Sequence, residues 1–143
     1  MWLTLAGIAG YLLSWAGAEL RGLCYQTLGK YFTFRLAVQE DQPLITSGPY
    51  AYLRHPGYLG AFLQGFGMEL SLILANPISL CYGRNLFKYS KEVEIILLIL
   101  GFFPGIVAML RRMTEEEMMM KAKIGKEYTD WERRTWRLIP FIY

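Results

Sequence analysis

The sequence has little of the material from which metal centres and disulfide frameworks are built. Its 143 residues include one histidine, His55, and two cysteines, Cys24 and Cys81, and neither cysteine has a second Cys or His at ligand spacing. We therefore expect no metal ion and interpret both cysteines as packing residues. Charged residues make up only 19% of the chain and form no basic stripe interleaved with polar residues, so we expect no nucleic-acid partner.

Apolar residues, in contrast, are abundant. Hydrophobic residues make up 54% of the chain and aromatic residues 15%, and the mean hydropathy is +0.23. These values are high for a soluble domain of this length and favour a single membrane domain in contact with lipid. Residues 2–18 form an apolar run that predicts a membrane span, in which Gly7, Gly10 and Gly17 allow another helix to approach closely.

A secretory signal is the alternative interpretation of this first run. Ala16-Gly17-Ala18 resembles a small-residue cleavage site. However, no basic region precedes the run, and the charged residues Glu19 and Arg21 follow it at once. We therefore favour the span.

The middle of the chain alternates between polar and apolar stretches. Residues 21–56 carry most of the early charges and several Pro and Gly breakers, which predicts a connector on the cytosolic side. Residues 57–110 predict a helical hairpin with apolar arms at 58–75 and 95–110. Because a carboxylate is expensive inside lipid, we expect Glu69 in the first arm to face protein or water.

Residues 111–143 are more polar and predict a cytosolic helical segment. Thr114-Glu115-Glu116-Glu117 matches a capping box, which predicts that a helix begins at Thr114 and runs to about Lys123. Gly125 is expected to interrupt it, and residues 127–134 predict a second short helix.

The stretch from Ser47 to Gly60 is the most informative part of the sequence. Arg54 and His55 stand directly before an apolar helix, and Pro56 suits the first turn, where its missing N–H group removes no hydrogen bond. The unpaired N–H groups of that turn and the helix dipole would favour an anion beside the two basic residues. The pattern therefore predicts a site for a carboxylate or a phosphate.

Several motifs occur in a characteristic order along the chain. They are Gly48-Pro49-Tyr50, Arg54-His55-Pro56-Gly57-Tyr58-Leu59-Gly60, Asn76-Pro77-Ile78, Glu116-Glu117, Ile124-Gly125-Lys126-Glu127-Tyr128 and Arg137-Leu138-Ile139-Pro140. In this order they resemble the isoprenylcysteine carboxyl methyltransferases, over residues 44–80 and 101–143. Residues 81–100 then correspond to an atypical insert in the hairpin, which could be a helix, a loop or an artefact of the gene model.

The resemblance implies an all-α, multispan helical integral membrane protein of the endoplasmic reticulum, with its active site facing the cytosol. The C-terminal cytosolic helical segment would complete the cofactor pocket. The implied enzyme moves a methyl group from S-adenosylmethionine to the C-terminal carboxylate of prenylated cysteine in CaaX-processed proteins. Its partners would be the prenylated protein C-terminus or prenylcysteine, and membrane lipid.

Site residues follow from the motifs and from this chemistry. The resemblance implies that His55 and the helix start at Pro56 bind the cofactor's carboxylate. We expect Arg54 or Arg137 to orient the substrate carboxylate through a planar pair of donors. The other expected cofactor-binding residues have aromatic or acidic side chains: Tyr50, Tyr52, Tyr58, Glu116 and Glu117. Glu117 is counted with Arg54 and Arg137 among the catalytic candidates.

Each of these residues also has a plainer interpretation. His55 could be a satisfied polar residue at a membrane interface, the tyrosines an aromatic belt, and Arg54 an interfacial anchor. The acidic residues at 115–117 could stabilise a helix start without binding anything.

The function has alternatives as well. A phospholipid amine methyltransferase would share the cofactor, and a membrane sterol reductase would use a nicotinamide cofactor instead. A shortened, inactive relative acting as a binding or scaffold protein would keep the fold signals without turnover.

Overall fold

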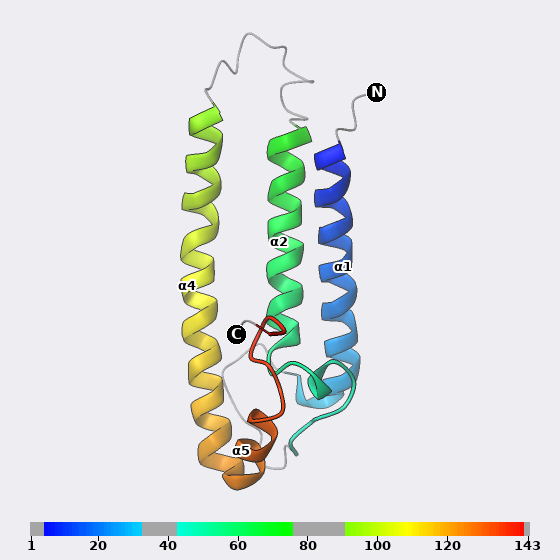
Figure 1. Ribbon diagram of the computed structural model, residues 1–143, viewed down its shortest axis with the longest axis vertical. Coiled ribbons are helices and arrows are strands. Elements are labelled where there is room, and N and C mark those ends of the chain that lie inside the picture. The colour runs from blue at the N-terminus through cyan, green and yellow to red at the C-terminus, as the bar shows by residue number, and fades with distance from the viewer. Residues whose placement is uncertain (1–4, 33–42, 76–90, 142–143) are drawn as a thin grey trace.

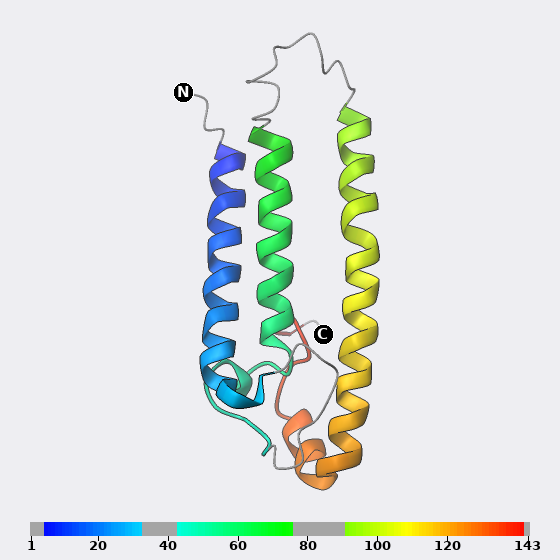
Figure 2. The same ribbon diagram turned by 180° about the vertical axis from the view of Figure 1, so that it is seen from behind.

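The computed structural model describes residues 5–32, 43–75 and 91–141, and this part of the chain is helical. The α-helices are α1 (Leu5–Leu28), α2 (Pro56–Ala75), α4 (Lys91–Ile124) and α5 (Lys126–Glu132), with short 3-10 turns η1 (Gly29–Tyr31) and η2 (Gly48–Ala51). The prediction of an all-α chain is thereby confirmed. The three long helices stand side by side, and α5 lies at the end where α2 begins (Figures 1 and 2).

Glycines let α1 and α2 pack with their backbones in contact. A Cβ atom added to Gly17 would lie 2.5 Å from the backbone nitrogen of Gln64, and one added to Gly67 would lie 2.5 Å from the carbonyl oxygen of Gly10. These distances are too short for any side chain, so glycine is required on both helices. The close approach predicted for Gly10 and Gly17 is confirmed.

The same contact continues toward the start of α1. The hydroxyl group of Ser71 donates a hydrogen bond of 3.2 Å to the carbonyl oxygen of Gly7. A serine that bonds across two helices has its hydroxyl donor satisfied within the protein. Helix α4 stands further from α2 than α1 does (Figures 1 and 2).

Helix α4 is one continuous helix where the sequence predicted two. The prediction that a helix begins at Thr114 was wrong, because the Thr114 hydroxyl donates a hydrogen bond of 3.0 Å to the carbonyl oxygen of Leu110, one turn earlier. Good helix formers on both sides of Thr114 let the helix run through it. Pro104 also lies inside α4.

The boundaries of the other helices agree better with the sequence. Helix α2 begins at Pro56 as predicted, and α4 ends at Ile124, just before Gly125 with its φ of 67°. That backbone conformation is favourable for glycine and ends the helix. Residues 91–100 of the supposed insert belong to α4, whereas 81–90 lie outside the described residues.

The predicted membrane spans overlap with helices of the structure, but the bounds differ. Helix α1 continues well beyond the predicted end at residue 18, and the two hairpin arms fall within α2 and α4. None of the helices in the described ranges combines the length and the apolar character needed to cross a membrane. The multispan prediction is therefore not confirmed.

Candidate functional site

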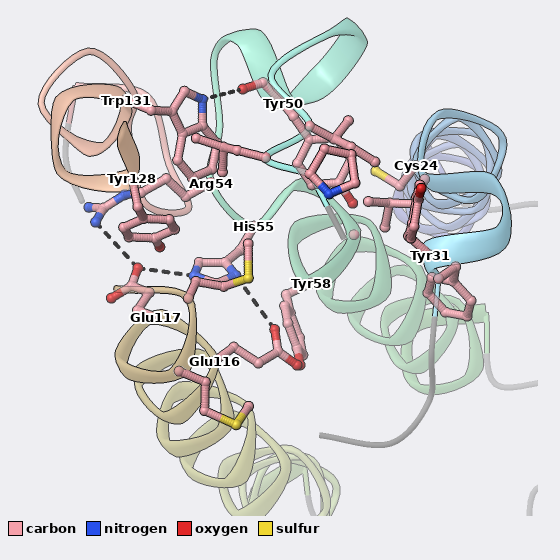
Figure 3. A pocket seen from close by; sticks show the side chains of 18 of the residues that line it. Cys24, Tyr31, Tyr50, Arg54, His55, Tyr58, Glu116, Glu117, Tyr128 and Trp131 are labelled. Carbon is pink, nitrogen blue, oxygen red and sulfur yellow. Dashed lines mark hydrogen bonds and ion pairs between the residues drawn. The ribbon is translucent and has the colours of Figure 1, made fainter. Parts of the chain in front are cut away.

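A cavity of about 280 Å³ lies at the end of the molecule where α2 begins. Its walls come from the last turns of α1, from η2, from the first turn of α2, and from α4 and α5. Figure 3 shows Cys24 and Tyr31 on one side of this cavity and Glu116 and Glu117 on the other. Segments far apart in the sequence therefore share one site.

The segment before α2 is held in place by the C-terminal part of the chain. Leu53 and Trp136 form an isolated parallel bridge. The backbone N–H of Arg54 donates to the carbonyl oxygen of Trp136 at 2.8 Å, and that of His55 donates to the carbonyl oxygen of Arg137 at 3.1 Å. This pairing fixes both basic residues at the start of α2 and brings the Arg137 side chain to the same place.

Glu117 is the centre of a buried ionic cluster. Its Oε1 atom lies 3.0 Å from His55 Nε2, 3.3 Å from Arg54 Nη1 and 3.0 Å from Arg137 Nε. The residue is only 8% exposed. Three basic side chains of the chain itself already contact this carboxylate. Glu117 therefore holds the two arginines and the histidine in position.

Burial alone would raise the pKa of Glu117, but the hydrogen bond from His55 and the positive charges of Arg54 and Arg137 outweigh it, so the pKa is lowered. The ionised carboxylate therefore stabilises the folded state above the ordinary pKa of 4.5, and this contribution is lost as the pH falls through the lowered value. We expect stability to drop in acid, measured by denaturant unfolding across the acidic range. A Glu117→Gln variant should show a flatter pH profile, and an unchanged profile would contradict this assignment.

Glu116 faces the other side of the His55 ring. Its Oε1 accepts hydrogen bonds from the Tyr58 hydroxyl at 2.5 Å and from Arg112 Nε at 3.1 Å, and its Oε2 lies 4.0 Å from His55 Nδ1. The His55 ring thus stands between two carboxylates, as Figure 3 shows. The adjacent acidic residues, which the sequence could not separate, have different surroundings: Glu117 is buried, and Glu116 is half-buried.

Most of the predicted site residues meet at this cavity. Those that line it are Tyr50, Arg54, His55, Tyr58, Glu116 and Glu117. Pro56 is fully buried at the start of α2, and Arg137 contacts Glu117 without lining the cavity. Tyr52 is not brought to the site, since it is 67% exposed and its neighbour Leu53 points into the core instead.

Sequence reasoning missed one wall of the cavity. The last turns of α1 supply Arg21, Cys24, Tyr25 and Leu28, whose spacing places them on one helix face. That spacing can be recognised in the sequence. However, no neighbouring residue indicates that this face of α1 meets the start of α2. Cys24 is fully buried, as expected of a packing residue.

Helix α5 supplies further residues that were missed. Tyr128 and Trp131 are buried and line the cavity. The indole nitrogen of Trp131 donates a hydrogen bond of 3.1 Å to the carbonyl oxygen of Tyr50 (Figure 3). Glu132 accepts from Arg54 Nη1 and lies 2.8 Å from Lys121 Nζ, so α5 is tied to both α4 and the start of α2.

The site therefore combines aromatic rings, carboxylates and basic groups around one cavity. Arg54 Nε is buried and has no hydrogen-bond partner among the described residues. A buried donor of this kind is expensive unless a ligand satisfies it. The arrangement suits a small molecule that carries both an anionic and a cationic group.

Comparison with known proteins places the chain in a family. The model of the isoprenylcysteine carboxyl methyltransferase (ICMT) family matches residues 10–122. The chain belongs to this family. The ICMT match begins well before residue 44, where the sequence resemblance began, and it covers most of α1, all of α2 and most of α4.

Individual members of the ICMT family are similar along nearly the whole chain. A probable protein-S-isoprenylcysteine O-methyltransferase of Oryza sativa subsp. indica is 28% identical over 93% of this chain and 60% of its own length. Protein-S-isoprenylcysteine O-methyltransferases of Dictyostelium discoideum and Rattus norvegicus are each 28% identical over 99% of this chain, and over 55% and 42% of their own lengths. The chain thus spans about half the length of these relatives.

Proposed function

We propose that this ICMT-family chain is a methyltransferase that moves a methyl group from S-adenosylmethionine to the C-terminal carboxylate of a prenylated cysteine in CaaX-processed proteins. The observation that carries this proposal is the meeting of two cavities of different character. The cavity described above, called the polar cavity because the charged residues Arg54, Glu116 and Glu117 line it, shares Arg21 and Tyr58 with a second, mostly apolar cavity of about 370 Å³ between α2 and α4. The names of the relatives support the same substrate class.

The polar cavity offers the groups that S-adenosylmethionine requires. Rings of Tyr25, Tyr50 and Tyr58 line it and would attract a sulfonium cation. His55 stands where a carboxylate can meet it, and Glu116 can accept hydrogen bonds from an amino group or from ribose hydroxyls. When bound, the cofactor supplies an electrophilic methyl group.

The apolar cavity offers a place for a prenyl chain. Phe62 and Phe102 line it, with ring centroids 5.3 Å apart, and Ile106 and Met109 continue its α4 side. The substrate carboxylate is ionised at neutral pH, so the transfer needs no general base. The protein's task is to align the two reactants and exclude water.

Arg54 is the residue proposed to hold the substrate carboxylate. Its Nη1 atom is engaged by Glu117 and Glu132, and its buried Nε donor has no hydrogen-bond partner among the described residues. Arg137 is the second choice, because it reaches the cluster through Glu117 and does not line the cavity. In this arrangement Glu117 serves the reaction by fixing both arginines.

Contact with lipid is part of the proposal. Large apolar side chains are exposed on α1 and α4, including Tyr11, Trp15, Leu100 and Phe103 at 59–70%. Such a surface is costly in water and matches the hydrocarbon of a bilayer. We place the protein at the endoplasmic reticulum membrane with the site facing the cytosol, where Arg111 and Arg112 would also lie.

The proposal is tested with purified protein in detergent micelles. We expect S-adenosylhomocysteine to bind in calorimetry and labelled methyl to be transferred from S-adenosylmethionine to N-acetyl-S-farnesylcysteine. Transfer to phosphatidylethanolamine instead would indicate a phospholipid amine methyltransferase, and binding of NADPH alone would indicate a reductase. Cofactor binding without transfer to any acceptor would indicate a binding protein.

An Arg54→Lys variant should separate substrate alignment from cofactor binding. Lysine keeps the charge near Glu117 but loses the planar pair of donors. We expect kcat/KM for the prenylcysteine to fall about hundredfold, with the Kd for S-adenosylhomocysteine changed less than about threefold. Arg111→Lys, on an exposed residue of α4, is the matched control. Equal losses in both variants would remove Arg54 from this role.

A further inference from the structure

A carboxylate outside the polar cavity contacts the arginine proposed to hold the substrate. The Oε1 atom of Glu132, the last residue of α5, accepts a hydrogen bond from Arg54 Nη1, and its Oε2 atom lies 2.8 Å from Lys121 Nζ of α4. Neither Glu132 nor Lys121 lines the polar cavity, whereas Arg54 does. Glu132 is therefore placed to act on a bound substrate through Arg54.

Helix α5 is attached to the protein by other contacts. Tyr128 and Trp131 are only 2% and 6% exposed, and the Trp131 indole donates a hydrogen bond to the carbonyl oxygen of Tyr50. Burial of two aromatic side chains, with their ring centroids 5.3 Å apart, gives a short helix a firm seat. The side chain of Glu132 is 22% exposed and adds no apolar contact to this seat. Its ion pair with Arg54 therefore calls for a role other than attaching the helix.

The Nη1 atom of Arg54 lies between two carboxylates. Glu117 Oε1 is 3.3 Å from it, and Glu132 Oε1 accepts its hydrogen bond. Because a guanidinium group is rigid and planar, two acceptors on one of its nitrogens restrict the orientation of the whole group. Glu117 is shared with His55 and Arg137, so Glu132 is the partner that Arg54 does not share with the rest of the ionic cluster.

We propose that Glu132 is a positioning residue, which sets the orientation in which Arg54 presents its guanidinium group to the prenylcysteine carboxylate. This inference rests on the proposed function. Lys121 holds the other oxygen of Glu132 and offsets its negative charge. A second carboxylate can thus stand beside Arg54 without cancelling the attraction of Arg54 for an anionic substrate.

A Glu132→Gln variant of the full chain in micelles tests the proposal with N-acetyl-S-farnesylcysteine. Glutamine keeps the size of the side chain but loses the charge that orients Arg54. We expect kcat to fall about tenfold, KM to change less than about threefold and the Kd for S-adenosylhomocysteine to change less than about twofold. Glu127→Gln, on an exposed side chain in the first turn of α5, is the matched control and should change none of these values.

The cofactor affinity distinguishes positioning from packing. Tyr128 and Trp131 line the polar cavity, so a displaced α5 would weaken the binding of S-adenosylhomocysteine. A Kd that rises about tenfold together with the fall in kcat would assign Glu132 to the packing of α5 and overturn the proposal.

A double variant tests whether Glu132 acts through Arg54. In the Arg54→Lys background the planar group that Glu132 orients is gone, so adding Glu132→Gln should lower kcat/KM by less than about twofold more. A further tenfold loss there, or an unchanged kcat in Glu132→Gln alone, overturns the positioning role and leaves the proposed function standing. Folded, unaltered protein that binds S-adenosylhomocysteine and methylates no prenylcysteine overturns the proposed function, and the role of Glu132 with it.

Discussion

Glu117→Gln is expected to lower the free energy of unfolding by about 3 kcal/mol and to reduce methylation to a small fraction of that of the unaltered protein. The Oε1 atom of Glu117 is shared by Arg54, His55 and Arg137 at 3.0–3.3 Å, and the side chains of these three partners are only 8–14% exposed. Glutamine keeps the shape but removes the negative charge. Two buried guanidinium groups would then lose their common counter-charge.

Activity is expected to fall more than stability at Glu117. Arg54 and His55 owe their side-chain positions to this carboxylate, although their backbones stay paired with the segment around Trp136. Misplacing aligned groups by a small distance has a large effect on a displacement reaction. Urea unfolding and initial rates of methyl transfer measure the two effects separately.

The matched control is Glu115→Gln on the same turn of α4. Glu115 is exposed, so this variant removes one carboxylate from the helix without touching the cluster. We expect its stability to change by less than about 0.5 kcal/mol. If Glu117→Gln has the same free energy of unfolding and the same rate of methyl transfer as the control, then the cluster does not organise the site.

Gly17→Ala is expected to destabilise the protein by about 2 kcal/mol, although alanine favours helices. The added Cβ atom would lie 2.5 Å from the backbone nitrogen of Gln64 and 2.6 Å from the carbonyl oxygen of Gly60. Both atoms belong to the backbone of α2, so no side-chain rotation relieves the contact and the helices must move apart. Thermal or denaturant unfolding measures the loss.

The control for this prediction lies in the same helix. Around a Cβ atom added to Gly22 the described residues place no atom within 4 Å. Gly22→Ala should therefore raise stability by up to about 1 kcal/mol, because it removes the conformational freedom of glycine in a helix. If Gly17→Ala did not lower the free energy of unfolding relative to Gly22→Ala, then α1 and α2 would not be in backbone contact.

Separation of α1 from α2 should also affect the site. Arg21, Cys24 and Tyr25 of α1 form one wall of the polar cavity. We expect Gly17→Ala to weaken S-adenosylhomocysteine binding in calorimetry and Gly22→Ala to leave it intact. This result would link the packing of the helices to the shape of the pocket.

The parts of the fold that were predicted correctly depend on local chemistry. Pro56 begins α2 and Gly125 ends α4, because the missing N–H of proline and the left-handed backbone of glycine act at their own positions. Thr114 was misjudged for the opposite reason. Its hydroxyl can cap a helix or bond one turn back within it, and the preceding residues decide between the two.

The site was predicted in part, because its chemistry is local and its assembly is not. The pairing of Arg54 and His55 with Glu116 and Glu117 followed from ordered motifs, but nothing near Tyr52 indicates that it points outward. The bridge between Leu53 and Trp136 decides which side chains of this segment enter the core. Such long-range pairings leave no pattern in a single sequence.

The bridge between Leu53 and Trp136 also has a consequence for biosynthesis. Ribosomes release a chain from its N-terminal end, so α1 and α2 can associate long before the residues around Trp136 leave the exit tunnel. Arg54 and His55 acquire their backbone partners only at that late moment. A nascent chain interrupted before then would hold two packed helices and no assembled candidate site.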